Sequence, residues 1–470
     1  MSNEHLPIAV IGAGPVGLAA AAQIVARGLA PLVFERGPSV GASLLEWSHV
    51  RVFSPWRYNI DAAARALLAP TGWDEPEETG LPTGGEIVER YLRPLAGIPA
   101  IAAGLELGAT VTAITRQGID KVSNAGREAA PFELRWTDAA GNDRSSLARA
   151  VIDASGTWTR PNPMGVDGLM VPGERAATDR VTYGIPDVLG ADRDSYAGRA
   201  TLVVGSGHSA INGALALLAL QEQAPGTKVF WALRRNRIDK LLGGGVNDQL
   251  PERGALGLAA KRAIDAGRIQ LLAPFAATRI ERSGDGLAVT ANLGQAPITL
   301  EVDRIIVATG FRPDLQILSE LRVSIDPATE APPALSPLID PNFHSCGSVR
   351  PHGVVELTHP ETGFYIVGAK SYGRAPTFLM ATGYEQARSV VAEIAGDHVA
   401  ARQVQLVLPE TGVCSTDLAA EPSAAGCCGG PALAATSCCV ADEVAKAEGE
   451  AGCGCGSAAA APKTQETELA

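Results

Sequence analysis

The feature that most constrains this chain is the stretch Gly12-x-Gly14-x-x-Gly17, which follows a short apolar run and precedes a helical pattern. Residues 8–11 are typical of a buried parallel strand, and residues 16–27 predict a helix. The first glycine permits a tight turn, the second lets backbone approach a pyrophosphate, and the third lets helix and strand pack closely. Phosphates would lie at the helix N-terminus, where unpaired N–H groups and the helix dipole favour anions.

A second predicted strand, residues 31–35, ends in Glu35. This acid lies about 20 residues beyond the glycines, where a carboxylate accepts a ribose hydroxyl. Strand, loop, helix and acid-terminated strand therefore agree on dinucleotide binding. A βαβ unit with a purely structural role is the alternative.

The same order of parts occurs again between residues 201 and 233, around Gly205-x-Gly207-x-x-Ala210. The second copy ends in Arg234-Arg235, where the first ends in Glu35-Arg36. A carboxylate repels a ribose 2′-phosphate, whereas arginines bind it through charge-assisted, often bidentate hydrogen bonds. The second copy therefore favours NADP over NAD, and two solvated arginines at the end of an edge strand are the alternative.

Composition excludes several classes of function. The chain has 470 residues, 46% of them hydrophobic, which is enough for two or three domains. Its formal net charge of -12 argues against a nucleic-acid partner or a polybasic membrane anchor. No apolar run reaches the roughly 18 residues of a membrane span, and the N-terminus has no basic n-region. We expect a cytoplasmic protein without nucleic-acid or membrane partners, and a homodimer stays open.

Each glycine motif is followed by β-like alternation and then by a strand that runs into an Ala-Ser-Gly or Ala-Thr-Gly turn, residues 150–156 and 304–310. With these turns and the apolar segment 363–368, residues 1 to about 400 resemble flavoproteins with two dinucleotide-binding domains. That superfamily includes thioredoxin reductases and flavin-dependent monooxygenases. The resemblance implies an α/β fold with two Rossmann-like domains, in which an NADP-binding domain (196–300) is inserted in an FAD-binding domain (1–195 and 301–400).

The resemblance also implies an FAD- and NADPH-dependent oxidoreductase with hydride transfer from nicotinamide to flavin. FAD would be held by Gly12, Gly14, Gly17 and Glu35, and NADPH by Gly205, Gly207, Arg234 and Arg235. Further cofactor contacts are expected at Pro15, Arg36, Ser155, Gly156, Gly310 and Gly368. Candidate pocket residues are Trp47, His49, Trp56, His352 and Lys370, with ordinary core or surface packing as the alternative for each. No catalytic residue is assigned.

Three departures from the superfamily bear on the reaction. Disulfide reductases carry a cysteine pair beside the flavin, but residues 37–56 and 205–233 contain no cysteine. The Phe-x-Gly-x-x-x-His fingerprint of Baeyer–Villiger monooxygenases is missing from residues 156–205. Where such proteins often have Gly-Asp at the flavin ribityl chain, this chain has Gly368-Ala369-Lys370.

Residues 409–470 differ in composition from the rest. They are mostly Ala, Gly, Ser, Pro, acids and Cys, too poor in large apolar groups to form a core, and predict a flexible tail. Six of the eight cysteines form three close pairs there: Cys427-Cys428, Cys438-Cys439 and Cys453-x-Cys455. Adjacent Cα atoms lie ~3.8 Å apart, below the ~4.4–6.8 Å usual for a disulfide. Both sulfurs thus remain available to one soft ion such as As(III), and a cysteine-bearing low-complexity tail is the alternative.

Vicinal-thiol tails resemble those of mercuric reductase and arsenic-handling proteins. A flavoprotein with this tail resembles the flavin monooxygenase-like proteins associated with arsenic resistance. Three functions stay open. The first is a monooxygenase-like enzyme for a trivalent arsenical or other soft metal ion. The second is a reductase that passes electrons through the tail thiols to a metal ion or a disulfide. The third is a metalloid-binding or redox-sensing flavoprotein without rapid turnover.

Overall fold

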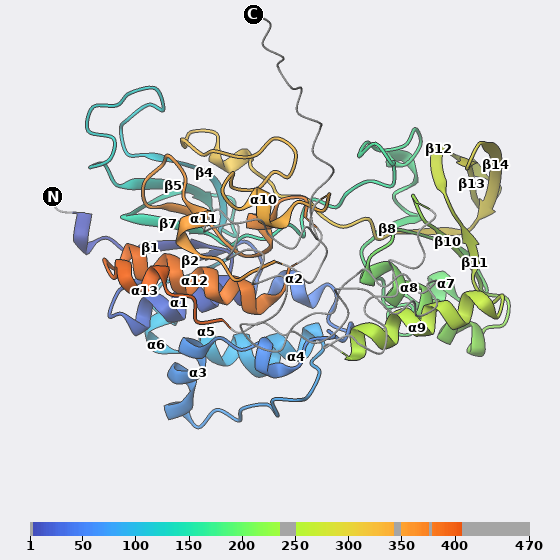
Figure 1. The fold of residues 1–470 in the computed structure, drawn as a ribbon, viewed down its shortest axis with the longest axis horizontal. Helices are drawn as coiled ribbons and strands as arrows, with labels where there is room; N and C mark the ends of the chain where they lie inside the picture. Colours follow the sequence, from blue (N-terminus) through green and yellow to red (C-terminus); the bar gives the residue numbers. More distant parts are fainter. Residues whose placement is uncertain (1–2, 236–250, 343–348, 376–377, 407–470) are drawn as a thin grey trace, which may run out of the picture. The chain divides into compact units, whose positions relative to one another are not determined.

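The structure is a computed structural model that describes residues 3–235, 251–342, 349–375 and 378–406 (Figure 1). All of these residues lie in one of the two compact units of the chain, Met1–Thr416. The tail predicted at 409–470, with its six candidate metal ligands, lies outside the described residues.

The first sheet contains five parallel strands in the order β16-β7-β1-β2-β3. Ile8 of β1 lies opposite Pro31 of β2 and Ala150 of β7. Two strands of this sheet come from distant parts of the sequence, so the first domain is discontinuous. The strands are β1 (Ile8–Ile11), β2 (Pro31–Glu35), β3 (Leu105–Leu107), β7 (Ala150–Asp153) and β16 (Phe364–Ile366).

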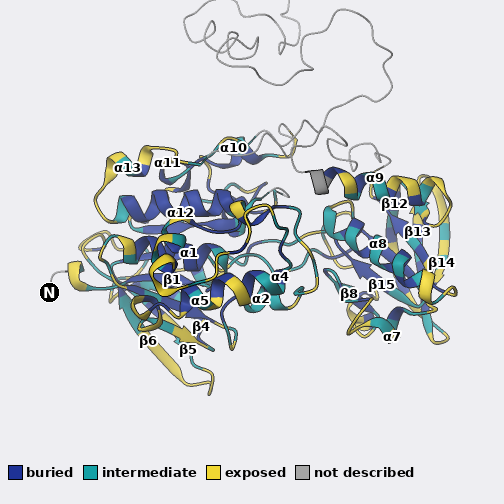
Figure 2. Cartoon of the chain, turned by 90° about the horizontal axis from the view of Figure 1, so that it is seen from below, coloured by how far each residue is buried: buried dark blue, intermediate teal, exposed yellow. Residues whose placement is uncertain are grey.

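Different layers cover the two faces of this sheet, because successive side chains of a strand point to opposite sides. Ile8 and Val10 join a core with the helices α1 (Pro15–Ala26) and α12 (Met380–Ile394). Ala9 and Ile11 join a second core with an antiparallel meander. Figure 2 shows α12 buried along most of its length. The meander strands are β4 (Thr110–Arg116), β5 (Phe132–Thr137) and β6 (Asp143–Ala148).

Residues 84–96 form a continuous helical segment of three parts, α4 (Gly84–Ile87), a π-helical turn (Val88–Leu92) and α5 (Arg93–Ala96). It begins with a capping box. The Thr83 hydroxyl accepts a hydrogen bond from Glu86 N (3.1 Å), and the Glu86 carboxylate accepts one from Thr83 N (2.7 Å). Other helices of this domain are α2 (Ala42–Leu45), α3 (Ala62–Leu68), α6 (Pro99–Ala102), α10 (Ser336–Ile339), α11 (Val354–Leu357) and α13 (His398–Arg402).

The second sheet has the same three layers. Its five parallel strands have the order β11-β10-β9-β15-β8. One face packs on helices α8 (His208–Gln223) and α9 (Pro251–Asp265), and the other on a second meander. The sheet strands are β8 (Val181–Tyr183), β9 (Ala200–Val204), β10 (Lys228–Ala232), β11 (Gln270–Leu272) and β15 (Arg304–Val307). The meander strands are β12 (Phe275–Ser283), β13 (Gly286–Leu293) and β14 (Ala296–Val302).

The domain boundaries drawn from the sequence need correction. The predicted division at 195/196 and 300/301 assigns β8 and β15 to the first domain, but both strands belong to the second sheet. β15 hydrogen-bonds directly to β9, so it lies inside that sheet. The segment 157–195 contains β8 and the short helix α7 (Arg193–Tyr196). The apolar pattern marks such strands as buried but does not indicate which sheet they enter.

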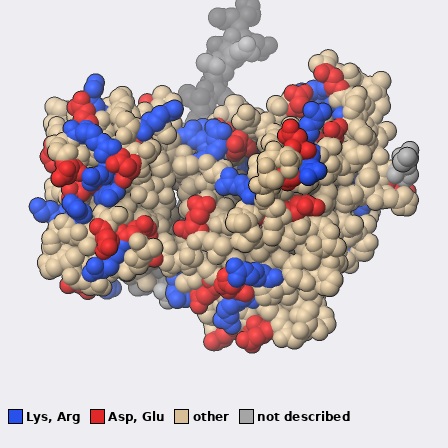
Figure 3. Space-filling model, turned by 180° about the vertical axis from the view of Figure 1, so that it is seen from behind, with Lys and Arg blue, Asp and Glu red and all other residues tan. Residues whose placement is uncertain are grey.

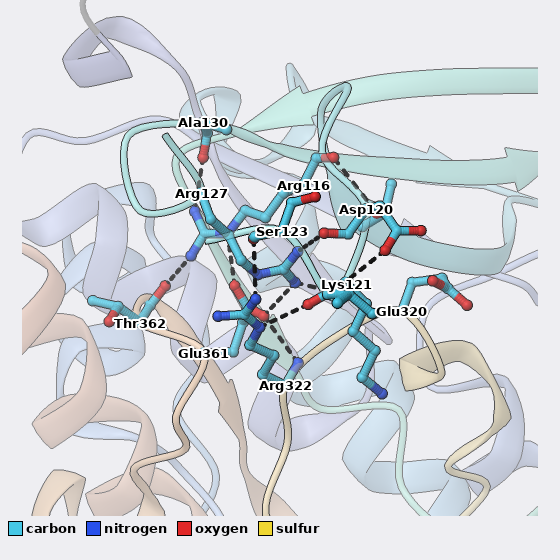
Figure 4. A network of polar contacts seen from close by, with 12 residues as sticks. Arg116, Asp120, Lys121, Ser123, Arg127, Ala130, Glu320, Arg322, Glu361 and Thr362 are labelled. Carbon is cyan, nitrogen blue, oxygen red and sulfur yellow. Dashed lines mark hydrogen bonds and ion pairs between the residues drawn. The ribbon is translucent and has the colours of Figure 1, made fainter. Parts of the chain in front are cut away.

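A buried polar network ties the first meander to the start of β16 (Figure 4). One carboxylate oxygen of Glu361 accepts a hydrogen bond from Arg116 Nε (2.8 Å). The other accepts hydrogen bonds from Arg127 Nη2 (2.6 Å) and the backbone N of Arg322 (2.9 Å). The side chains of Glu361, Arg116 and Arg127 are at most 4% exposed. Because Glu361 precedes β16, the network lies at the amino end of that strand and is structural.

Two further findings concern the surface. Within the described ranges, no helix has both the length and the apolar character needed to cross a bilayer. Figure 3 shows acidic and basic side chains interspersed on one face of the molecule, without a broad field of one sign on that face.

Candidate cofactor sites

The first glycine motif forms a tight loop between β1 and α1. Gly12 has a positive φ of 96°, and a Cβ there would lie 2.8 Å from Ala154 O, which follows β7. A Cβ on Gly17 would lie only 1.9 Å from Gly12 O. The packing of the loop against β7 and α1 therefore requires both glycines, as the motif predicts.

Gly14 differs from these two glycines. It is the N-cap of α1, and no atom lies within 4 Å of the position that its Cβ would take. No side chain caps this helix, so the first N–H groups have no hydrogen-bond partner within the helix. Pro15 occupies the first helical turn, where its fixed φ favours a helix start. Free space and unpaired donors are what the phosphates of a dinucleotide require.

Glu35 holds this loop in shape. It is 8% exposed, and its two carboxylate oxygens accept hydrogen bonds from the backbone N of Ala13 and of Gly37, each at 2.8 Å. Each oxygen has a second lone pair, so a ribose hydroxyl can still donate to it. Sequence reasoning predicted the ribose contact and missed the structural one. Arg36 beside it is exposed.

The second glycine motif repeats this division of roles. Gly205 has a φ of 140°, and a Cβ there would lie 2.2 Å from Ala308 O, which follows β15. Gly207 is the N-cap of α8 and has no atom within 4 Å of its Cβ position. In both domains the loop packs on the turn after a neighbouring strand and leaves the helix N-terminus open. The residues present thus fit one dinucleotide phosphate group at each loop.

The comparisons with known proteins agree with this geometry. Residues 6–332 match the model of the pyridine nucleotide-disulphide oxidoreductase family. The chain belongs to this family. Membership confirms the predicted flavoprotein superfamily, the α/β fold and the class of FAD- and NADPH-dependent oxidoreductases.

The individual relatives share little sequence identity with this chain. A ferredoxin–NADP reductase of Thermus thermophilus is 23% identical over 359 residues, 74% of this chain and 86% of the relative. The bacillithiol disulfide reductase of Bacillus cereus has a TM-score of 0.60 and 19% identity, covering 83% of this chain and 99% of its own. The ornithine N-hydroxylase of Kutzneria sp. 744 has a TM-score of 0.57 and 16% identity, covering 83% and 98%. At these identities the solved structures show the shared fold alone.

The predicted 2′-phosphate site of this oxidoreductase lies just beyond β10, where Arg234 and Arg235 are both exposed. We expect the Arg234→Gln/Arg235→Gln double variant to bind NADPH at least about tenfold more weakly, because charge-assisted hydrogen bonds to a phosphate are lost. Affinity for NADH, which has no 2′-phosphate, should stay unchanged. Titration of both nucleotides checks this, with Arg279→Gln in β12 as control, at a side chain that is 58% exposed. An equal loss for both nucleotides would contradict the assignment.

Lys370, a candidate pocket residue, is held in a buried ion pair at the carboxyl end of β7. Its Nζ donates hydrogen bonds to Asp153 Oδ2 (2.6 Å) and Ser155 Oγ (3.0 Å), and Ser155 Oγ donates to Asp153 Oδ1 (2.6 Å). The side chains of Lys370 and Asp153 are 1% and 0% exposed. Lys370 therefore fastens the 3₁₀ turn Gly368–Tyr372 to β7, beside the predicted contacts Ser155 and Gly156.

We expect Lys370→Met to lower the free energy of unfolding by about 3–5 kcal/mol, because Asp153 would stay buried without its counter-charge. The double variant Asp153→Asn/Lys370→Met should recover much of this loss. Urea unfolding of the FAD-free protein measures both, with Lys261→Met as a control at a side chain that is 46% exposed. Equal stability of Lys370→Met and the wild type would show that the ion pair is not needed.

His352 and Gly368 both contact the buried side chain of Gln386, which forms a second buried polar network. Gly368 N donates to Gln386 Oε1 (2.7 Å), and Gln386 Nε2 lies 2.9 Å from His352 Nε2. His352 Nδ1 lies 3.0 Å from Arg350 O, so Nδ1 carries the proton and Nε2 accepts. Burial lowers the pKa of His352, which is 1% exposed and stays neutral. His352 thus supports the Gly368 turn through Gln386, a residue that the sequence did not single out.

The remaining predicted residues divide between core and surface. Trp56 is 3% exposed and belongs to the first core, so the packing alternative holds for it. His49 is exposed, and Trp47 is partly buried against Gly84. Gly310 has a φ of 88° in the turn that follows β15. Within the described part of the chain, no three His, Cys, Asp or Glu side chains form a metal-binding group.

An aromatic cluster that the sequence did not single out lies after the two Ala-Ser/Thr-Gly turns. Trp158 and Phe311 stack with ring centroids 4.5 Å apart and an interplanar angle of 29°. Trp47 lies 6.5 Å from Trp158, and Trp158 Nε1 donates to a Glu46 carboxylate oxygen (2.7 Å). Trp158 follows β7 and Phe311 follows β15, so the stack joins the segments that leave the two sheets.

Proposed function

We propose that the chain binds FAD at the Gly12–Gly17 loop and NADPH at the Gly205–Ala210 loop, and acts as a monooxygenase-like enzyme on a trivalent arsenical or other soft metalloid. The observation that carries the choice of reaction is the position of the cysteines. Residues 6–332, which match the family, contain none of the eight. A disulfide reductase needs a thiol pair beside the flavin, and this part of the chain cannot supply one.

The proposed reaction balances without a protein disulfide. Bound FAD supplies the transfer of two electrons from NADPH to dioxygen. NADPH, one proton, dioxygen and the trivalent substrate give NADP⁺, water and the singly oxygenated substrate. The chain contributes the two phosphate loops, the Glu35 carboxylate for a ribose and the 2′-phosphate arginines. Its tail cysteines, as soft thiolates, would bind the metalloid.

Known structures with the same fold include both classes of enzyme, so the fold does not decide between them. The Kutzneria structure is titled as an ornithine N-hydroxylase with reduced FAD, NADP⁺ and L-ornithine, while the Bacillus cereus protein is a disulfide reductase. The absence of cysteine before Cys346 favours the oxygen-dependent reaction for this chain. Vicinal cysteines that bind a soft metalloid have to stay reduced, so we propose the cytoplasm as the location of the protein.

The test is a steady-state assay of NADPH oxidation and oxygen uptake by the FAD-loaded protein, with and without arsenite. We expect arsenite to accelerate both, with one dioxygen consumed per NADPH. The variant with all six tail cysteines replaced by Ser should keep NADPH-dependent flavin reduction but need more arsenite. Arsenite-dependent NADPH oxidation without oxygen uptake would contradict the monooxygenase.

A reductase that works through the tail is the second candidate, favoured by the six paired tail cysteines and by the family's disulfide chemistry. In that case the six-serine variant would lose turnover under anaerobic conditions, and the wild type would reduce a disulfide or metal ion without oxygen. Slow NADPH oxidation with every substrate, together with tight arsenite binding, would instead favour a metalloid-binding or redox-sensing flavoprotein.

A further inference from the structure

Three arginines come together from segments that leave their strands at the carboxyl end. Arg160 follows β7, Arg312 follows β15, and Arg374 follows β16 and the 3₁₀ turn Gly368–Tyr372. In open α/β sheets, ligands bind outside the carboxyl ends of the strands. None of the three was singled out by the sequence, and neither glycine loop includes them.

Arg312 is oriented by neutral groups only. Its Nε donates to Asn162 Oδ1 (2.8 Å), and its Nη2 donates to Gly168 O (3.1 Å). Its backbone N donates to Arg160 O (2.9 Å), so the two arginines lie on neighbouring segments of the chain. Within the described residues, Nη1 of Arg312 forms no hydrogen bond. The guanidinium is thus fixed in place with donors still available.

Arg374 approaches the same loop. A Cβ on Gly168 would lie 4.0 Å from Arg374 Nη1, and Gly168 O already accepts the hydrogen bond from Arg312. The side chain of Arg374 is 39% exposed and that of Arg160 is 49% exposed. A small ligand in solution can therefore reach the cluster.

The three arginines of the cluster differ in their acidic partners. Arg160 pairs with Asp314 (3.3 Å) and Arg374 pairs with Glu330 (2.7 Å), but Arg312 has no acidic partner within the described residues. Burial, together with the positive charges of Arg374 and Arg160, holds the pKa of Arg312 below its ordinary value, although Glu330 opposes this effect. The nearby Asp167 is exposed, and its carboxylate accepts a hydrogen bond from Leu169 N. The charge of Arg312 is therefore not neutralised by a direct ion pair within the described residues.

We propose that Arg312, with Arg160 and Arg374, forms an oxyanion-binding site that is separate from both glycine loops. A guanidinium with free donors, held by neutral partners beside two further arginines, suits a tetrahedral oxyanion or a carboxylate. The ligand is either a free oxyanion or the phosphate of a bound nucleotide, which share this chemistry. The proposal does not depend on the reaction proposed above.

Calorimetric titration of the FAD-loaded full chain with inorganic phosphate, in a buffer without other oxyanions, tests this site. We expect saturable binding that Arg312→Gln weakens at least about tenfold. The control Arg279→Gln, at an exposed side chain of β12, should leave this binding unchanged. Arg374→Gln is the second variant, because Arg374 is more exposed than Arg312 is and its loss leaves the Asn162 and Gly168 contacts intact. It should weaken phosphate binding in the same direction.

A second arm separates the two sources of the anion. For a free-oxyanion site, phosphate binding persists in Arg234→Gln/Arg235→Gln and in the presence of saturating NADP⁺. For a nucleotide phosphate, NADP⁺ displaces inorganic phosphate and Arg312→Gln weakens NADP⁺ binding, which still supports the cluster as the anion site. The proposal is overturned if the wild type shows no saturable binding at millimolar phosphate. It is also overturned if the Arg312→Gln and Arg374→Gln proteins bind phosphate as the wild type does.

Discussion

A Gly14→Ala protein is expected to fold as the wild type does and to bind FAD at least about tenfold more weakly. No atom lies within 4 Å of the new Cβ, so the change in the free energy of unfolding should stay within about 1 kcal/mol. The added methyl group would occupy the space where backbone approaches the pyrophosphate. Equilibrium titration of the FAD-free protein with FAD, and urea unfolding of the same protein, measure the two effects separately.

Gly17→Ala is the matched counterpart with the opposite result. Its Cβ would lie 1.9 Å from Gly12 O, a backbone atom that cannot move without opening the loop. We expect a loss of stability on the order of 3 kcal/mol or more. The same contrast should hold in the second domain between Gly207→Ala, which weakens NADPH binding, and Gly205→Ala, which destabilises. If Gly14→Ala binds FAD with unchanged affinity, the first loop is not the phosphate site.

Glu361→Gln is expected to lower the free energy of unfolding by about 3–5 kcal/mol. The amide would leave Arg116 and Arg127 buried without a counter-charge. It also has only one acceptor oxygen, where the carboxylate offers one oxygen to each arginine. Figure 4 shows how these arginines converge on the one carboxylate. Glu281→Gln, at a side chain that is 59% exposed, is the control and should change stability by less than about 0.5 kcal/mol.

The effect of Glu361→Gln should depend on pH. Burial alone would raise the pKa of Glu361, but hydrogen bonds from Arg127, Arg322 N and Arg116 leave it below its ordinary value of 4.5. A lowered pKa in the folded state gives stability that is present above the unfolded-state pKa and is lost as the pH falls. Urea unfolding between pH 7 and pH 3 should therefore show the wild type losing its advantage over Glu361→Gln below about pH 4.5. A constant difference across that range would contradict the role of the carboxylate charge.

Local patterns predicted the parts of the fold that depend on neighbouring residues. The β1–loop–α1 unit and its second copy lie where the sequence indicates, because strand burial and glycine turns are set within a few residues. Periodicity could not assign β15 to the second sheet, since pairing with β9 joins residues about 100 positions apart.

The candidate site was predictable to a similar extent. Motif spacing identified Gly12, Gly14, Gly205 and Gly207, and the structure explains why one glycine of each pair is required by packing and the other is open. Motif spacing could not indicate that Lys370 pairs with Asp153, or that Glu361 pairs with both Arg116 and Arg127. These partners are more than 200 residues apart in the sequence. In a single sequence, a buried charge has no signal that distinguishes it from an exposed one.

The proposed function requires that the two phosphate loops bind FAD and NADPH on one chain. The most direct measurement is the visible absorption spectrum of the purified protein, after incubation with FAD and gel filtration, before and after anaerobic addition of NADPH. We expect about one FAD per chain and loss of the yellow flavin band on adding NADPH. A colourless protein that takes up no FAD would contradict the proposed function.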